Sequence, residues 1–250
     1  MKKFVADLHI HTCLSPCAEL DMTPRRIINA AVDRGLDIIA ITDHNSAENT
    51  GIAVKIGRER GITVLPSMEV TSYEEAHILA LFGSMENIIK LQEIIYGSLS
   101  GVNDAKAFGY QLKVNEDDEI LEFNDRLLIG ATNLFVKDTV NIIRSLGGLA
   151  VASHIDRGSF SVLSQLGFIP DGVRFDALEI SYNTEIRQAE SIFSGYRHIP
   201  LITSSDAHHL DDIGRRTTSF FLEEASFDEI ARAFNGEGQR RIELSNGVMG

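Results

Sequence analysis

Short apolar runs rich in β-branched residues alternate along this chain with segments of helical periodicity. Runs of this length bounded by turn residues are typical of buried strands, and their alternation with helices is typical of βα units. A β-sandwich or a helical bundle would not produce this pattern. The chain therefore predicts an α/β fold. The seven predicted strands lie at residues 3–8, 36–42, 62–69, 77–82, 149–154, 177–181 and 201–204.

Helix boundaries are marked between these runs. Thr23 followed by Pro24 is an N-cap with proline at the first helical position, and the apolar periodicity that follows ends at Gly35. A second helix is predicted over 136–146, where Gly147 stops it. These signals support helices between the predicted strands.

The chain is long enough to bury one sizeable core, and no stretch rich in Pro, Gly and Ser divides its 250 residues. We therefore predict a single domain over residues 1–250. The segment 97–135, between the fourth and fifth predicted strands, has no clean period and carries the acidic run 116–119. Long structureless loops are unusual inside a compact domain, so we expect an insertion or a lid over the barrel mouth.

Metal-type side chains are concentrated at the ends of the predicted strands. Six of the eight histidines lie there, whereas His198 and His209 have the character of surface residues or outer neighbours. In barrels, functional sites are built at the carboxyl ends of the strands. His9 and His11 are two apart in an extended segment and point to the same side, so both can bind one ion. The other residues of this set are Asp43, His44, Glu69, His77, His154, Asp206 and His208.

These motifs resemble the PHP (polymerase and histidinol phosphatase) family of metal-dependent phosphoesterases. The matching strings are His9-Ile10-His11, Thr42-Asp43-His44, Glu69 with His77, His154, and Asp206-Ala207-His208. The resemblance implies a distorted seven-stranded (β/α)7 barrel with an insertion between the fourth and fifth strands. It also implies two or three divalent metal ions, zinc, manganese or iron.

The resemblance further implies roles for the individual residues. Glu69 would bridge two ions. In phosphoryl chemistry at such a site, Asp206 or His208 would orient the attacking nucleophile, so these three are the expected catalytic residues. The expected metal ligands are His9, His11, Glu19, His44, Glu69, His77, His154, Asp206 and His208.

Glu19 stands in this set because the chain departs from the family pattern after the first motif. Many members carry a ligand aspartate there, whereas this chain has Ser15-Pro16-Cys17-Ala18-Glu19. Counting back from Thr23 places Glu19 at that position, and counting forward from His11 places Pro16 or Cys17. We favour Glu19 over Cys17; a carboxylate suits manganese and iron as well as zinc, whereas a thiolate would bias the site to zinc.

Three further side chains are expected beside the metals. Asp43 is expected to orient a ligand histidine, or to contact a metal-bound water. Arg157 and Arg215, or its neighbour Arg216, are candidates to bind substrate phosphate, because the planar guanidinium matches phosphate oxygens.

The function that this set predicts is a metal-dependent phosphoesterase. Paired metals polarise phosphoryl oxygens and activate water, so a metal-bound hydroxide would attack phosphorus. The expected substrate is a phosphomonoester or phosphodiester, such as a nucleotide, a small phosphorylated metabolite or an oligonucleotide end. One alternative is an amidohydrolase-type C–N hydrolase, which is disfavoured because no lysine follows a predicted strand. The other is a non-catalytic metal-binding module, which a nearly complete ligand set disfavours.

Charge and composition bear on partners and location. The formal charge of −13 argues against a stable nucleic-acid complex, which needs a basic face, although bound cations would still make a local positive site. The start of the chain lacks the apolar run of a secretory signal, and no segment is apolar enough to span a membrane. We expect a cytoplasmic protein in which Cys13 and Cys17 are free thiols or ligands. The sequence leaves the oligomeric state open.

Overall fold

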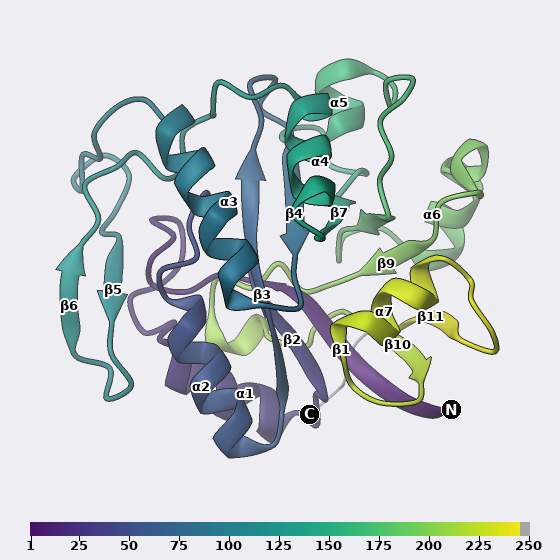
Figure 1. Ribbon diagram of the computed structural model, residues 1–250, viewed down its shortest axis with the longest axis horizontal. Helices are drawn as coiled ribbons and strands as arrows, with labels where there is room; N and C mark the ends of the chain where they lie inside the picture. The colour runs from purple at the N-terminus through teal and green to yellow at the C-terminus, as the bar shows by residue number, and fades with distance from the viewer. Residues whose placement is uncertain (246–250) are drawn as a thin grey trace.

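A curved sheet of nine strands organises the computed structural model, which describes residues 1–245 of the chain (Figure 1). The strands are ordered β11-β10-β1-β2-β3-β4-β7-β8-β9. Seven of them coincide in position with the predicted strands, and β10 and β11 are additional. Their bounds are β1 (Lys2–Ile10), β2 (Ile38–Ile41), β3 (Thr63–Thr71), β4 (His77–Leu81), β7 (Leu149–Ala152), β8 (Ala177–Ile180), β9 (Leu201–Thr203), β10 (Thr217–Leu222) and β11 (Arg241–Ser245).

The sheet curls until β9 approaches β10. The Thr218 hydroxyl accepts a hydrogen bond from the Thr203 amide at 2.9 Å and donates one to the Thr203 carbonyl at 2.8 Å. Inside the curl, Ala6, Leu8 and Phe220 belong to one buried apolar cluster to which most strands contribute. The α/β fold class is confirmed, with a nearly closed, barrel-like sheet. It has nine strands rather than seven because β10 and β11 add an antiparallel pair beside β1.

The helices pack on the outside of the sheet (Figure 1). The predicted helix after Thr23 is α1, with Pro24 in its first turn, and it ends before Gly35, whose φ of 68° glycine adopts readily. Within residues 1–245, no helix combines the length and the apolar character that crossing a bilayer requires. The helices are α1 (Pro24–Asp33), α2 (Thr50–Arg60), α3 (Met85–Ser98), α4 (Val136–Ser145), α5 (Val162–Leu166), α6 (Ile186–Ile192), α7 (Phe227–Phe234) and the 3₁₀ turns Ser194–Tyr196 and Leu210–Asp212.

The direction of β4 explains why a candidate ligand stands at the start of a strand. β4 pairs antiparallel with both β3 and β7, and His77 lies opposite Thr71 in the register of β3 and β4. The first residue of β4 therefore reaches the same rim of the sheet as the carboxyl end of β3.

An irregularity in β1 redirects its last residues. Ala6 and Leu8 face the interior cluster, so strict alternation would turn His9 away from it. The register between β1 and β2 shifts between Asp7 and Ile10, which indicates a β-bulge. A bulge changes the phase of the side chains and is common beside functional sites. It accounts for the arrival of His9 at the rim.

The segment between α3 and α4 leaves the main sheet. It forms its own hairpin of β5 (Leu112–Val114) and β6 (Ile120–Phe123), which projects from the body in Figure 1. The Asn45 side-chain amide donates to the carbonyls of Leu128 and Gly130, both at 2.8 Å, and fastens the base of this segment beside the rim. Whether the segment acts as a lid stays a prediction.

Candidate metal centre

The carboxylate of Glu69, at the end of β3, lies at the middle of the histidine cluster and is buried with 1% exposure. Its Oε1 atom is 3.1 Å from His77 Nδ1, 3.3 Å from His9 Nε2 and 3.4 Å from His154 Nε2. Burial alone would raise the pKa of Glu69, but the neighbouring His77 and His9 outweigh it and hold the pKa well below its usual range. The group therefore carries a negative charge at neutral pH.

The other oxygen of Glu69 faces a different pair of rings. Oε2 is 3.2 Å from His44 Nδ1 and 3.6 Å from His11 Nε2. Each carboxylate oxygen thus has its own histidine neighbours. This is the geometry required of a carboxylate that bridges two cations.

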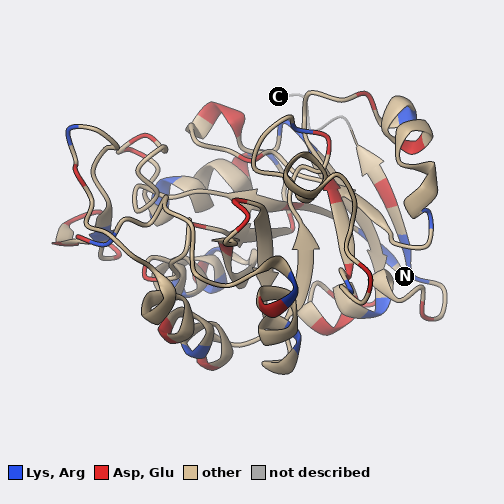
Figure 2. Ribbon diagram, turned by 90° about the horizontal axis from the view of Figure 1, so that it is seen from above, with Lys and Arg blue, Asp and Glu red and all other residues tan. Residues whose placement is uncertain are grey.

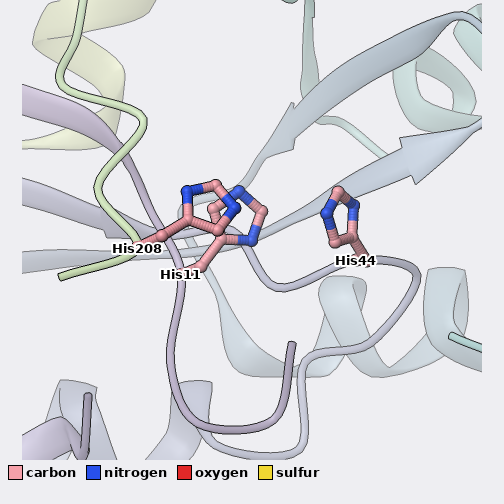
Figure 3. A group of neighbouring side chains, drawn as sticks. All are labelled: His11, His44 and His208. Carbon is pink, nitrogen blue, oxygen red and sulfur yellow. The ribbon is translucent and has the colours of Figure 1, made fainter. Parts of the chain in front are cut away.

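Donor atoms close enough to share an ion form overlapping groups of three. Figure 3 shows one group, in which imidazoles from the ends of three separate segments converge. The atoms of each group all lie within 4.8 Å of one another. The groups are His11, His44 and His208; His9, His11 and Asp206; and His44, Glu69 and His77.

Unsatisfied polar atoms show that these residues fit divalent metals. His44 Nδ1, His77 Nδ1 and Glu69 Oε1 are buried, and within residues 1–245 none of them makes a hydrogen bond of suitable geometry, although each of the two nitrogens lies within 3.2 Å of a Glu69 oxygen. A buried polar atom without a partner costs about 1–3 kcal/mol, so several of them at one point need a further explanation. Imidazole nitrogen and carboxylate oxygen are common ligands of zinc and also suit iron or manganese.

Asp206 reaches the cluster from the loop after β9. Its Oδ1 is 3.2 Å from His9 Nε2 and 3.3 Å from His11 Nε2. Burial would raise the pKa of Asp206, but His9 and His11 outweigh it and the pKa is lowered well below its usual value. The loop is fixed to β1 because the His11 amide donates to the Ala207 carbonyl at 3.0 Å.

Backbone strain occurs at the same rim. Asn45, His154 and Asp206 have φ values of 51°, 29° and 50°, in the left-handed region that non-glycine residues rarely occupy. Such strain is typical of functional sites, where the surrounding structure holds a residue in place. Two of these three residues are candidate ligands.

His208 completes the rim and is the most accessible of the clustered imidazoles. Its ring stacks on that of His11 with centroids 4.3 Å apart (Figure 3). Its Nδ1 is 2.9 Å from the carbonyl oxygen of Asp206, and its side chain is 25% exposed. His208 is therefore placed to meet both the cluster and an incoming substrate.

Asp43 acts on the cluster through a serine. The Ser15 hydroxyl donates a hydrogen bond to Asp43 Oδ1 at 2.7 Å. Its oxygen lies 3.0 Å from His11 Nδ1 and can accept a hydrogen bond from it. This series of hydrogen bonds directs Nε2 of His11 into the cluster. Burial, with a contribution from His208, lowers the pKa of His11 to about 4, so the ring is neutral at pH 7. Asp43 was expected to orient a histidine directly, and the intermediate Ser15 was not anticipated.

This relay predicts a measurable effect of removing one hydroxyl. Ser15→Ala is expected to weaken metal affinity by about 10- to 100-fold, because outer hydrogen bonds fix the orientation of ligand histidines. Competition with a chromogenic chelator measures the affinity. Ser46→Ala is a matched control, because Ser46 is a buried serine bonded to Tyr96 at 2.7 Å. Equal affinities in the two variants would contradict the relay.

Glu179 in β8 is a site residue that sequence reasoning missed. Its Oε2 atom is 3.0 Å from His9 Nδ1 and accepts from the His154 amide at 3.1 Å. Burial would lower the pKa of His9, but the charges of Glu179, Asp206 and Glu69 raise it well above its usual value. The site thus concentrates negative charge that bound cations would balance. A carboxylate in the otherwise apolar run 177–180 was the available signal.

Glu19 is not brought into the cluster, contrary to our preference. Its side chain is 59% exposed and pairs with His209 at 3.2 Å, on the outside of the loop. Burial of the Cys17 sulfur, followed by the charges of Glu69 and Asp206, raises the pKa of the Cys17 thiol. Of the two candidates, Cys17 is therefore the one whose side chain experiences the field of the cluster, although the residue as a whole is exposed.

The candidate arginines differ in their surroundings. Arg157 Nη2 is 2.6 Å from Asp206 Oδ2, with a side chain that is 30% exposed at the rim. Arg215 donates from Nε to the Ser205 carbonyl at 3.0 Å, and its guanidinium lies 3.3 Å from the centre of the Tyr182 ring. Arg215 thus supports the loop that carries Asp206, and Arg157 is the better placed to meet substrate.

Comparison with family models gives two matches. The chain matches the model described as PHP domain over residues 7–165, which is more than half of its length. It matches the model described as PHP-associated over residues 185–236. The first match contains all the motifs up to His154, and Asp206 and His208 fall within the second.

Individual relatives are more distant. The chain is 24% identical to YqxK of Bacillus subtilis over an alignment of 279 positions that covers 99% of this chain and 66% of YqxK. It is 28% identical over 82 residues to the phosphoribosyl 1,2-cyclic phosphate 1,2-diphosphodiesterase of Eggerthella lenta, which is 31% of this chain and 30% of that protein.

Among solved structures, the chain resembles the lesion-specific endonuclease PfuEndoQ from Pyrococcus furiosus. The TM-score is 0.76 at 19% identity, over 96% of this chain and 58% of that one. Endonuclease Q bound to a 27-mer duplex with an abasic lesion gives a TM-score of 0.75, again at 19% identity, and covers the same shares. At this identity the likeness concerns the fold alone. The chain spans less than two thirds of the length of YqxK and of endonuclease Q.

Proposed function

Because this chain belongs to the PHP domain family, we propose that it is a metal-dependent phosphoesterase that hydrolyses a phosphomonoester or phosphodiester. The observation that carries the proposal is the position of Glu69, whose two oxygens face separate groups of histidines. Paired cations held about 3.5–4 Å apart are a recurring arrangement in phosphatases and nucleases.

The ligand residues hold the ions in this proposal. Glu69, Asp206 and the histidines would hold the ions, while Glu179 orients His9 and Asp43 orients His11 through Ser15. When bound, zinc, manganese or iron supplies Lewis-acid polarisation of the phosphoryl oxygens and activates water near neutral pH. Several carboxylates in a buried pocket favour two or three such ions over one.

Asp206 and His208 act on the reacting groups. Asp206 is held ionised by His9 and His11, so its carboxylate can accept a hydrogen bond from the attacking water and align it with phosphorus. His208 lies at the accessible edge of the cluster, where its ring can contact the same water or the leaving oxygen. In-line attack then depends on where the phosphoryl group is held.

Arg157 positions the phosphoryl group. In this structure its guanidinium pairs with Asp206, and a phosphate at the cluster would offer oxygens to the same donors. The pairing keeps the Arg157 side chain at the rim before substrate arrives. Arg215 contributes indirectly, because its bonds to backbone carbonyls stabilise the loop that carries Asp206.

Charge favours a small or short substrate over extended nucleic acid. The net charge is −13, and in Figure 2 the Lys and Arg residues are dispersed among acidic ones. A continuous basic face is needed for tight binding to a long duplex. Nucleotides, phosphorylated metabolites and oligonucleotide ends fit this surface better, and the cations themselves would attract their phosphates.

Metal removal tests the proposal. With added Mn²⁺, the protein is expected to hydrolyse p-nitrophenyl phosphate or bis-p-nitrophenyl phosphate, and chelation should abolish turnover until metal is restored. Loss of metal should also lower the thermal midpoint, since a ligand at 100 times its Kd stabilises by about 2.7 kcal/mol. Absorbance at 405 nm and a thermal melt measure both. Bound metal without turnover of either ester would instead favour a non-catalytic metal-binding module.

A further inference from the structure

Phe160 places an aromatic ring against the metal centre. Its ring stacks on that of His77 at an interplanar angle of 24°, with centroids 5.0 Å apart. The His77 amide donates to the Phe160 carbonyl at 2.9 Å, so backbone and side chain are both fixed to the start of β4. The residue nevertheless remains 45% exposed. The part of the ring that His77 does not cover is available to solvent or to a ligand.

The backbone of Phe160 is strained. Its φ is 56°, in the left-handed region, which a bulky side chain occupies only at a cost of about 1–3 kcal/mol. A residue that filled the core would offset this cost by burial, but nearly half of Phe160 is in contact with solvent. Strain combined with an exposed aromatic ring indicates that the ring serves at the site.

The loop that carries Phe160 also carries Arg157, the candidate phosphate-binding residue. His154, Arg157 and Phe160 follow one another between β7 and α5. Ser161 anchors the end of this loop, because its hydroxyl caps α5 by accepting from the Ser164 amide and also donates to the Arg157 carbonyl, both at 3.0 Å. A phosphoryl group held by the cluster and Arg157 would therefore have its next substituent close to a fixed aromatic ring.

We infer that Phe160 is a stacking platform for a nucleobase, and hence that the substrate is a nucleoside phosphate ester. This inference rests on the proposed phosphoesterase function and specifies its substrate class. A nucleobase is the planar group that commonly lies one sugar away from a phosphate. Base stacking on an aromatic side chain contributes about 1–3 kcal/mol per base and tolerates any base, because every base has a π-face.

A simpler explanation is that Phe160 serves only to pack against His77. The ring would then keep water from a ligand histidine, and its removal would damage every reaction at the cluster equally. A nucleobase platform instead acts only on substrates that have a base. The ratio of activities on two substrates that differ only in the nucleoside separates these cases.

The experiment compares thymidine 5′-(p-nitrophenyl phosphate) with methyl p-nitrophenyl phosphate on the metal-loaded protein. Both are diesters with the same leaving group, so their kcat/KM ratio reports the contribution of the nucleoside. Phe160→Ala and Phe160→Leu are expected to lower this ratio at least about fivefold, whereas Phe160→Tyr should preserve it. Phe168→Ala is the control, since Phe168 is 58% exposed and lies beyond α5, and it should leave the ratio as in the wild type.

An unchanged ratio in Phe160→Ala overturns the inference, whether both activities fall together or neither falls. Turnover of neither diester by the wild type would count against diesterase activity rather than against the platform. The affinities for thymidine 5′-monophosphate and for ribose 5-phosphate, measured by calorimetry, then test the platform. Selective weakening of the nucleotide in Phe160→Ala supports the platform, and equal affinities of wild type and variant for the nucleotide refute it.

Discussion

Replacing Glu69 by glutamine is expected to remove more than one metal ion per chain and to lower kcat at least about 10³-fold, or ~4 kcal/mol in the barrier. The carboxylate offers one charged oxygen to His9, His77 and His154 and the other to His11 and His44. Glutamine has a single neutral carbonyl oxygen, and its amide nitrogen is a donor that does not ligate cations. Elemental analysis of the purified variant measures the ions retained.

The size of the metal loss distinguishes a bridge from a terminal ligand. A terminal ligand serves one ion, so the loss of one ion or fewer would show that Glu69 does not bridge. Glu75→Gln provides the control, because Glu75 is an exposed carboxylate in the turn between β3 and β4. It should keep the metal content of the wild type. Glutamine matches glutamate in shape, so the variant is expected to fold.

Local patterns were sufficient to predict most of the fold. The seven predicted strands are apolar runs with clear boundaries, and α1 is marked by Pro24 at one end and Gly35 at the other. β10 and β11 were missed because their stability comes from distant partners. Lys2 pairs with Leu222 across nearly the whole chain, and no residue of β11 is fully buried, although the run Thr217–Leu222 contains the β-branched and aromatic residues that strands favour.

The convergence of the histidines on one rim was predictable, but other members of the cluster were not. Histidines at strand ends are visible in the sequence, whereas Ser15 and Glu179 act through hydrogen bonds that only the folded chain reveals. The preference for Glu19 relied on counting residues, and the structure places this side chain outside the cluster. The loop from Thr12 to Met22 runs through successive turns, in which the amides of Ser15 and Met22 bond to carbonyls three residues back. Sequence distance does not measure spatial distance along such a path.

The spacing of His9 and His11 was interpreted correctly for an incomplete reason. Alternation predicts that residues two apart share a face, and His9 Nε2 is indeed 3.2 Å from His11 Nε2. Leu8 faces the interior, however, so regular alternation would have turned His9 to the outside. The irregularity between Asp7 and Ile10 reverses which side the following side chains face. Bulges of this kind depend on pairing with the neighbouring strand, so a single strand's sequence does not reveal them.

Replacing His11 by alanine should reduce phosphoesterase activity at least about 10³-fold, because the loss removes a ligand from two overlapping donor groups. The fold should survive, since the apolar cluster under the rim is formed by other residues, such as Ala6 and Leu8. The metal-free variant is therefore expected to unfold cooperatively. Its midpoint should not rise with added Mn²⁺, whereas that of the wild type should. Steady-state kinetics and thermal melts with and without metal measure both effects.

His209→Ala is the matched control for this prediction. His209 follows His208 in the sequence, but its side chain is 58% exposed and contacts Glu19 rather than the cluster. The control should keep both its activity and its metal-dependent rise in midpoint. Burial leaves His11 neutral, and Ser15 directs its Nε2 at the cluster, so this nitrogen is available to bind a cation. Full activity in His11→Ala would therefore refute the ligand role of His11 and, with it, the sharing of ligands between neighbouring ions.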